Sequence, residues 1–263
     1  MIPVPRAQGT GPDFAAITME GYLVRRLPVL SGLVLTALLA IAPGAEARRA
    51  VKCNRTVKSV TVRSDLIVPA GGACRLVRVT VRGDIEVRAG GYLQATHTTV
   101  HGNAVGRRAQ TLFFDGRSRV KGNVVGDRTG QVFVFASTVE GRIDVRQAAG
   151  KVNICGNTVR GDIHIAKRSG PDILVGDPLA IDCPGNRVTR GDILLEDNAT
   201  DVELVVRGNT LKRGDLQLRR NGGPSAKTVQ ENTGAGRLVC LGNAAPFAAS
   251  GNSGWATLLG QCA

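Results

Sequence analysis

The fold is decided by the stretch Val81-Arg82-Gly83-Asp84-Ile85-Glu86-Val87, because its pattern recurs along the chain at nearly constant spacing. The central glycine has counterparts at successive intervals of 19, 20, 19, 20, 30, 23 and 22 residues. A fixed period of about 20 residues is typical of a solenoid, in which each repeat buries its apolar edge against its neighbours. The repeated glycines are Gly83, Gly102, Gly122, Gly141, Gly161, Gly191, Gly214 and Gly236.

Apolar residues stand at the second and fourth positions after most of these glycines, as Ile85 and Val87 do after Gly83. Such alternation, rich in Val and Ile, predicts a short strand with one buried face. In two repeats the fourth position is itself glycine, at Gly106 and Gly126, so the strand signal there is weaker.

A second apolar, alternating row lies between the glycine motifs and predicts another strand in every repeat. An apolar residue also lies two places before the first five of these glycines, and one place earlier at Val188 and Leu211, which predicts a bulge or wider corner there. Glycine is expected at the corners because it tolerates positive φ, and the Asp or Asn after it because its side chain bonds nearby amides. The predicted second strands are centred on 93–95, 112–114, 132–134, 152–154, 173–175 and 202–204.

Two or three short strands with glycine corners leave no room for a helix and make one coil of a parallel β-helix. We therefore predict an all-β, right-handed parallel β-helix of about ten coils, roughly 20–23 residues each, from residue 52 onward. A β-propeller is excluded, because its blades need about 40–45 residues.

The amino-terminal region has the pattern of an export signal. Arg25 and Arg26 precede an apolar run over residues 27–42, and Ala45-Glu46-Ala47 is a small-x-small cleavage pattern. The run has 16 residues, fewer than the roughly 20 that span a bilayer, which favours a cleaved signal over a retained anchor. Residues 1–47 are thus predicted to be an upstream extension and cleaved signal peptide, and 48–263 a single β-helix domain, secreted or cell-wall associated, without a membrane span. Met1 and Met19 both remain open as the start.

All six cysteines follow the predicted cleavage site, and an even number in an exported chain indicates disulfides. Taken in sequence order, partners are 21, 28 and 22 residues apart, close to one coil each. Stacked residues on adjacent coils lie at a separation that a disulfide accepts, and the outer pairs would fasten the fraying ends of the solenoid. Without a Cys-x-x-Cys pair, metal binding is not expected. The predicted pairs are Cys53–Cys74, Cys155–Cys183 and Cys240–Cys262.

The net charge of +13, carried mostly by arginine, favours an anionic partner such as an anionic glycan or cell-wall polymer. Export and an aromatic content of 3% argue against nucleic acid, since few rings are available to stack on bases. A merely soluble, arginine-rich surface is the alternative, and self-association stays open. The arginines predicted to bind a polyanion are Arg82, Arg160, Arg190 and Arg213.

These four arginines each begin an Arg-Gly-Asp tripeptide, which suggests adhesion to receptors. Corner chemistry explains the tripeptides equally, because His101, Lys121 and Glu140 stand before other motif glycines. We interpret them as repeat corners. Asparagines that recur near the later corners are predicted to form stacked amide ladders. They are Asn157, Asn186, Asn209, Asn232, Asn243 and Asn252.

Parallel β-helices include polysaccharide lyases and hydrolases, which use grouped acids. A row of Asp84, Asp162, Asp192 and Asp215 would be interrupted by other residue types. The insertion 167–190 carries Asp172, Asp177 and Asp182, which could bind calcium or act as acid and base, although solvation of a loop is the favoured interpretation. His97, His101 and His164 are expected at the surface. No catalytic residue, metal or cofactor is predicted.

The Val-x-Gly-Asp/Asn-Ile-x-Val repeat resembles that of bactofilins, polymer-forming bacterial β-helix proteins, over roughly residues 79–218. Bactofilins act inside the cell and lack paired cysteines, so this chain departs from their pattern. The tail Leu238–Asn243, followed by Gly260-Gln261-Cys262, is similar to uncharacterised secreted proteins of high-GC Gram-positive bacteria, which implies the same fold and compartment. The expected function is a non-enzymatic structural or binding role at the cell envelope. The alternative is a carbohydrate-active enzyme of the pectate-lyase-like class.

Overall fold

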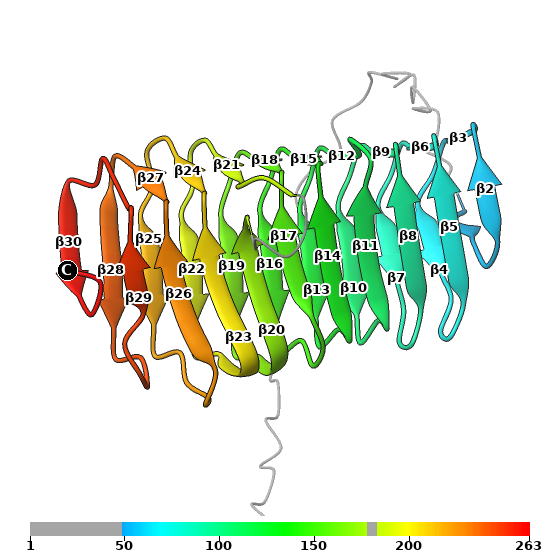
Figure 1. Cartoon of the computed structure of the whole chain (residues 1–263). Coiled ribbons are helices and arrows are strands. Elements are labelled where there is room, and N and C mark those ends of the chain that lie inside the picture. Colours follow the sequence, from blue (N-terminus) through cyan, green and yellow to red (C-terminus); the bar gives the residue numbers. More distant parts are fainter. Residues whose placement is uncertain (1–48, 178–182) are drawn as a thin grey trace, which may run out of the picture. The chain divides into compact units, whose positions relative to one another are not determined.

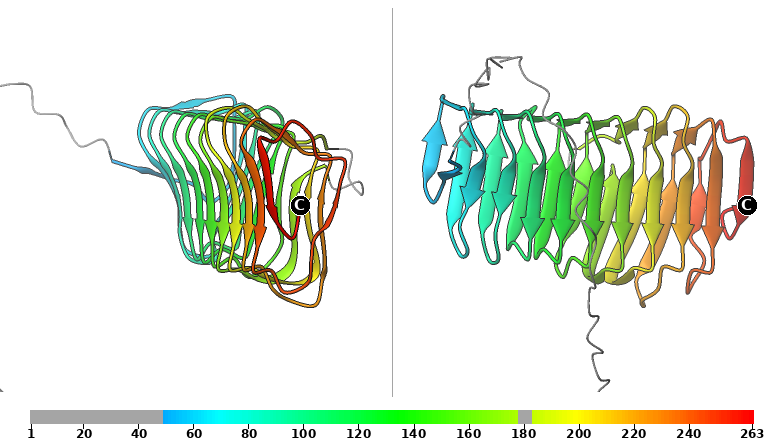
Figure 2. Two further views of the ribbon diagram at one scale, coloured as in Figure 1. Left: turned by 90° about the vertical axis from the view of Figure 1, so that its left-hand side faces the viewer. Right: turned by 180° about the vertical axis from the view of Figure 1, so that it is seen from behind.

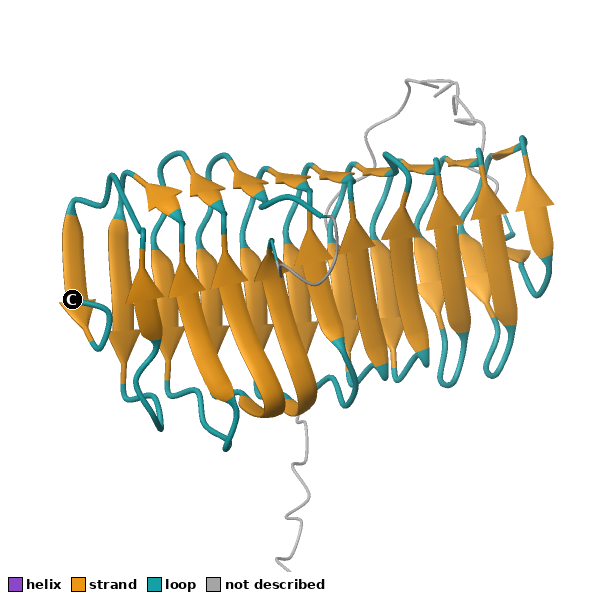
Figure 3. Cartoon of the chain, in the orientation of Figure 1, coloured by secondary structure: helices purple, strands orange, loops and turns teal. Residues whose placement is uncertain are grey.

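The structure, a computed structural model, describes residues 49–177 and 183–263; the predicted export signal lies outside them. Three parallel sheets run along a β-solenoid of about ten turns, and no helix occurs in this part of the chain (Figures 1 and 3). In Figure 1 the near strands run upward, the chain crosses the top, descends in the far sheet and advances leftward, which is a right-handed winding. Nowhere in the described ranges is there a helix long and apolar enough to cross a membrane.

As far as β29 the strands follow one another in the order sheet A, sheet B, sheet C, so every third strand belongs to the same sheet; β30 then returns to sheet A. Sheet A contains β1 (Val51–Lys52), β4 (Leu66–Val68), β7 (Ile85–Val87), β10 (Ala104–Arg107), β13 (Val124–Asp127), β16 (Ile143–Arg146), β19 (Ile163–Ala166), β22 (Ile193–Glu196), β25 (Leu216–Arg219), β28 (Arg237–Leu241) and β30 (Thr257–Gly260). Sheet B contains β2 (Thr56–Lys58), β5 (Ala73–Val77), β8 (Tyr92–Thr96), β11 (Thr111–Asp115), β14 (Gln131–Phe135), β17 (Val152–Cys155), β20 (Ser169–Gly176), β23 (Ala199–Arg207), β26 (Ala226–Gln230) and β29 (Ala248–Ser250). Sheet C contains β3 (Thr61–Val62), β6 (Thr80–Val81), β9 (Thr99–Val100), β12 (Arg119–Val120), β15 (Thr138–Val139), β18 (Thr158–Val159), β21 (Arg187–Val188), β24 (Thr210–Leu211) and β27 (Thr233–Gly234).

The coils stack in register, as Figure 2 shows from the C-terminal end and from behind. Ile143 pairs with Ile163, and Ile163 with Ile193, so like residues lie above one another in the interior. Glycine at Gly106 is explained by packing, since a Cβ there would lie 2.9 Å from the Leu112 side chain of the facing sheet. The small residue at this position therefore makes room for the Leu112 side chain, and the predicted alternation of inward and outward residues is confirmed.

The motif glycines are needed for close approach between coils, which corrects the expected reason. None of the eight has a positive φ. A Cβ on Gly214 would lie 2.0 Å from the carbonyl oxygen of Gly191 on the preceding coil, so only hydrogen fits between the stacked backbones. Positive φ occurs at other corners, both at glycines such as Gly90 (φ 69°) and at residues with long side chains such as Arg128 (φ 52°) and Arg220 (φ 51°).

Where Asp or Asn follows a motif glycine, its side chain bonds the coil that follows. Oδ1 of Asp84 accepts a hydrogen bond from the Asn103 amide at 2.6 Å, and Oδ1 of Asp192 accepts one from the Asp215 amide at 2.8 Å. The acidic row is interrupted as predicted, and Oδ1 of its aspartates holds the corner of the next coil. Its role in this fold is structural.

Asparagines form two ladders, which confirms the predicted stacking of amide side chains. In the first, each amide nitrogen donates to the Oδ1 of the next rung at 2.9–3.1 Å. Asn243 does not belong to it and lies in a second ladder, at the corner between sheets A and B. The first ladder consists of Asn157, Asn186, Asn209, Asn232 and Asn252, and the second of Asn198, Asn221, Asn243 and Gln261.

All three predicted cysteine pairs lie at disulfide distance. The Cα atoms are 5.4 Å apart in Cys53–Cys74, 5.8 Å in Cys155–Cys183 and 5.4 Å in Cys240–Cys262. The first and last pairs join the terminal coils, where a solenoid has no further neighbour. The middle pair closes the longest coil.

One predicted strand was placed in the wrong register. Leu204 pairs with Ile173 and Val206 with Val175, so the inward pair is Leu204 and Val206 and not Val202 and Leu204. Val202 is 61% exposed. The pairing shifts between Gly170 and Asp172, and this irregularity in the long coil displaces the alternation.

Two cations are buried among the apolar residues. Arg168 is 1% exposed and its Nε donates to the carbonyl of Gly150 at 3.1 Å; burial lowers its pKa to about 10. Lys227 occupies the register position opposite Leu204 and donates from Nζ to the carbonyl of Gly223 at 3.0 Å; burial lowers its pKa too. Both charges are bound by backbone oxygens within the solenoid.

Candidate functional site

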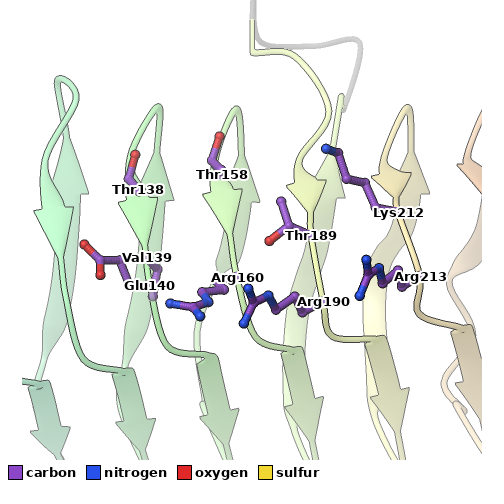
Figure 4. A pocket seen from close by; sticks show the side chains of 9 residues that line it. All are labelled: Thr138, Val139, Glu140, Thr158, Arg160, Thr189, Arg190, Lys212 and Arg213. Carbon is purple, nitrogen blue, oxygen red and sulfur yellow. The ribbon is translucent and has the colours of Figure 1, made fainter.

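The candidate site is a groove of about 470 Å³ along the outer face of sheet C and the corners that follow its strands. Figure 4 shows Arg160, Arg190 and Arg213 in a row on successive coils, with Lys212 beside Arg213. These cations follow strands β18, β21 and β24, just before the motif glycines. Three threonines, Thr138, Thr158 and Thr189, complete the polar lining. We call this the basic groove.

The four cations of the basic groove are exposed and unpaired. Within the ranges that the structure describes, the side chains of Arg160, Arg190, Lys212 and Arg213 make no hydrogen bond or ion pair. The groove contains one acid, Glu140, and Arg119 already pairs with it at 2.6 Å. Like charges held on neighbouring coils repel one another, and an anion placed between them would relieve that repulsion.

Two arginines on or next to sheet A are paired with carboxylates, in contrast to those of the groove. Arg220 pairs with Asp197 at 2.6 Å, and Arg237 pairs with Asp215 at 2.7 Å. These hydrogen bonds raise the pKa of both guanidinium groups. The charges of Arg220 and Arg237 are therefore compensated by carboxylates, whereas those of the groove cations stay available to a ligand.

Three of the four predicted polyanion-binding arginines come together. Arg82 does not join them, because the coils between carry His101, Lys121 and Glu140 at the corresponding positions. Lys212 was not predicted. The sequence signal was the extra residue between the apolar position and the glycine in the later repeats, which adds a second outward side chain at that corner.

The Arg-Gly-Asp tripeptides are repeat corners. In the tripeptide at Arg190, the glycine stacks closely on the coil before it and Asp192 accepts the amide of Asp215. Only the arginine side chain projects freely. A receptor that binds the aspartate side chain would compete with the hydrogen bond that this side chain accepts from the backbone of the next coil.

His164 is half-buried on sheet A, which corrects the expectation of a surface histidine; His97 and His101 are exposed as expected. Its Nδ1 lies 3.2 Å from Oδ1 of Asp144 and its Nε2 lies 3.2 Å from Oε1 of Glu196. The hydrogen bond to Asp144 raises the pKa of His164, against the effect of burial.

Asp144 is buried beneath this histidine and also contacts Arg142 and Arg146, at 3.1 and 3.0 Å. Burial opposes its ionisation, but the hydrogen bonds from His164 and Arg146 prevail and hold the pKa of Asp144 below its usual range. Both nitrogens of His164 are engaged with carboxylates, so neither is free to act as a base. The cluster ties three coils together.

Two of the three carboxylates predicted in the insertion 167–190, Asp172 and Asp177, lie among the described residues. Asp182 lies outside the described residues, and no group of three or more possible metal ligands occurs in the remainder. Asp172 faces outward on sheet B, where it is the register partner of Glu203 and pairs with Lys151 at 3.1 Å. These three residues line a cavity of about 330 Å³.

Comparisons with protein-family models, with curated proteins and with solved structures gave no match to this chain. The likeness to bactofilins and to secreted Gram-positive proteins therefore stays a prediction.

Proposed function

We propose that this protein is an exported, non-enzymatic binding protein of the cell envelope that holds an anionic polymer in the basic groove. The observation that carries the proposal is the convergence of four unpaired cations, Arg160, Arg190, Lys212 and Arg213, on one cavity of the described chain. Three cysteine pairs at disulfide distance favour an oxidising compartment, in which such a polymer would be met.

A polymer running parallel to the solenoid axis would meet one cationic corner per coil, at the strand spacing of about 4.8 Å. Guanidinium groups suit carboxylate and phosphate alike, since their paired donors match two oxygens of either group. The corners are held rigidly by glycine stacking and by the Asp and Asn bonds. The protein side of the interface therefore has little backbone order to gain on binding.

The test compares two triple variants that remove equal charge. The groove variant carries Arg160→Gln, Arg190→Gln and Arg213→Gln. The control carries Arg55→Gln, Arg75→Gln and Arg107→Gln, three exposed arginines on other surfaces. Binding of polyphosphate and of polygalacturonate is measured by titration at low and at physiological salt. The two polymers distinguish a phosphate from a carboxylate ligand.

The groove variant should bind its polymer about 10- to 100-fold more weakly, from roughly 0.5–1 kcal/mol per exposed ion pair. The control should lose much less, and added salt should weaken wild-type binding through screening. Equal losses in the two variants would mean that net charge alone attracts the polymer, and the groove would have no role.

One observation favours the alternative, a carbohydrate-active enzyme of the pectate-lyase-like class. Asp172 and Glu203 lie opposite each other on adjacent strands, and both line the cavity on sheet B. Paired carboxylates can serve as acid and base in glycoside cleavage. Release of unsaturated or reducing ends from a polysaccharide, abolished in Asp172→Asn, would establish the enzyme and refute the non-enzymatic proposal.

A further inference from the structure

Three phenylalanines form an apolar floor on the outer face of sheet B, on the side of the solenoid that carries β11 and β14. The ring of Phe113 lies 5.9 Å from that of Phe133 and 5.6 Å from that of Phe135, and Phe133 and Phe135 are 5.9 Å apart. Phe113 and Phe133 are register partners. Apolar rings on the outside of a protein with an aromatic content of 3% indicate a contact surface.

Polar groups without partners among the described residues stand next to this floor. Asn153 on β17 is 5% exposed and Asp172 on β20 is 6% exposed, and the Oδ1 atom of each accepts no hydrogen bond from that part of the chain. The other oxygen of Asp172 lies 3.1 Å from Nζ of Lys151. Both residues line the same cavity as the three rings.

Unpartnered buried acceptors are unfavourable for folding, so their presence needs a reason. Outward positions on this sheet do not require polar residues, since the neighbouring coils carry Leu174 and Phe133 in the same column as Asn153. An amide placed there gains its hydrogen bond when a ligand supplies a donor.

The chemistry of the cavity selects the ligand class. The ligand must offer an apolar face to the rings and at least two donors to the carbonyl and carboxylate oxygens. The lining has two carboxylates, Asp172 and Glu203, and one cation, Lys151, so its net charge is negative and disfavours an anionic ligand. The rings pack against one another and leave no box around a cation. Hydroxyl groups around a ring of C–H bonds meet all these conditions.

We propose that this cavity binds one ring of a neutral saccharide, with its C–H face on Phe113 and Phe133 and its hydroxyls hydrogen-bonded to the side chains of Asn153 and Asp172. A volume of about 330 Å³ is sufficient for one such ring, with the rest of the glycan lying outside. The site lies on sheet B and does not depend on the basic groove.

The decisive variant is Asn153→Leu. It replaces an unpartnered amide with an apolar side chain in a column that already holds leucine and phenylalanine, so the fold should be kept or made more stable. Saccharide binding should nevertheless weaken by more than about 10-fold. If Asn153 had a purely structural role, its replacement would not weaken saccharide binding while the fold stayed equally or more stable.

Binding is measured by saturation-transfer NMR with maltose, cellobiose, lactose and N,N′-diacetylchitobiose at about 10 mM each, a range that detects millimolar dissociation constants. Tyr92→Ala is the matched control, because Tyr92 faces outward on β8 of the same sheet but does not line the cavity. At least one sugar should bind the wild type and the Tyr92→Ala variant, with ring C–H protons receiving the strongest saturation. The groove triple variant should bind the same sugar unchanged.

Three results would overturn the proposal: no binding of any of the four sugars to the wild type, unchanged binding to the stable Asn153→Leu variant, or loss of binding in the groove triple variant. The last result would assign the sugar contacts to the basic groove. Loss of polyanion binding without loss of sugar binding would support both sites separately.

Discussion

Replacing Asn209 by alanine should destabilise the solenoid strongly, because this side chain bonds the coils on both sides of its own. Asn209 is a completely buried inner rung of the first asparagine ladder. Its Oδ1 accepts the amide and the Nδ2 of Asn186 at 3.1 and 3.0 Å. Its Nδ2 donates to Oδ1 of Asn232 and to the carbonyl of Val175, both at 2.9 Å, and to the carbonyl of Arg207 at 3.2 Å.

The magnitude follows from these contacts. Five hydrogen bonds disappear in the alanine variant, and a typical bond contributes about 1 kcal/mol net. The partners on both neighbouring coils lose their bonds while they stay buried, because Asn186 and Asn232 are almost completely shielded from solvent. Allowing for shared donors and acceptors, the expected loss of unfolding free energy is about 3–5 kcal/mol.

The assay is urea unfolding followed by circular dichroism, together with amide hydrogen exchange, since a solenoid can unfold in parts. Asn252→Ala is the control at the end of the ladder, where three side-chain bonds are made to a single neighbouring coil. It should lose about half as much or less. Equal effects, or a loss below about 1 kcal/mol for Asn209→Ala, would refute the reasoning that stacked amides carry stability between coils.

Three further changes test other parts of the structure. Gly214→Ala should lower the free energy of unfolding by more than about 3 kcal/mol, because the new Cβ would lie 2.0 Å from the Gly191 carbonyl oxygen. Gly222→Ala is the control and should be near neutral in the same assay, since no atom lies within 4 Å of its Cβ position. Similar values for the two variants would contradict close stacking of the coils. Replacing Cys155 and Cys183 by alanine should cost about 3–4 kcal/mol from the chain entropy of a 28-residue loop, read from the melting temperature with and without reductant. Because the pKa of His164 is raised, its contribution to the free energy of unfolding is fully present below about pH 6.5 and is lost as pH rises through the folded pKa. The urea midpoints of wild type and His164→Gln should therefore converge at high pH. A difference in midpoint that stays constant with pH would exclude the ion-pair network as its cause.

The architecture could be predicted because a solenoid repeats its physical constraints in every coil. One motif such as Arg160-Gly161-Asp162 contains the glycine at the close approach and the acid that bonds the next coil. The cysteine pairs followed from the same period, since one coil in sequence is one strand spacing in space. The reason for the glycines was wrong: a sequence shows where glycine recurs, but not whether dihedral angle or contact requires it.

The register of β23 was wrong because the long coil interrupts the period. The shift between Gly170 and Asp172 changes which residues face inward, and Val202 fits the apolar alternation of the sequence although it is exposed. Alternation alone cannot locate such a shift. The cavity on sheet B depends on that register, because Glu203 lies opposite Asp172 when Ile173 pairs with Leu204.

The candidate sites were predicted in part. Arginines at the corners of sheet C were recognised, but their pairing state was not, because Arg119 and Glu140 meet only when adjacent coils are aligned. The partners of His164 are 20 and 32 residues away in sequence, on two different coils. Contacts between outward side chains depend on side-chain direction and length, and the repeat period does not determine either of them.

Arginine footprinting measures directly whether an anionic polymer binds in the basic groove. The protein is treated with phenylglyoxal with and without bound polymer, and modification is read for each arginine by mass spectrometry. Arg160, Arg190 and Arg213 should be protected, and the exposed Arg75 on sheet B should react equally in both samples. Equal protection of all four, or unchanged reactivity of the three groove arginines at saturating polymer, would contradict the account.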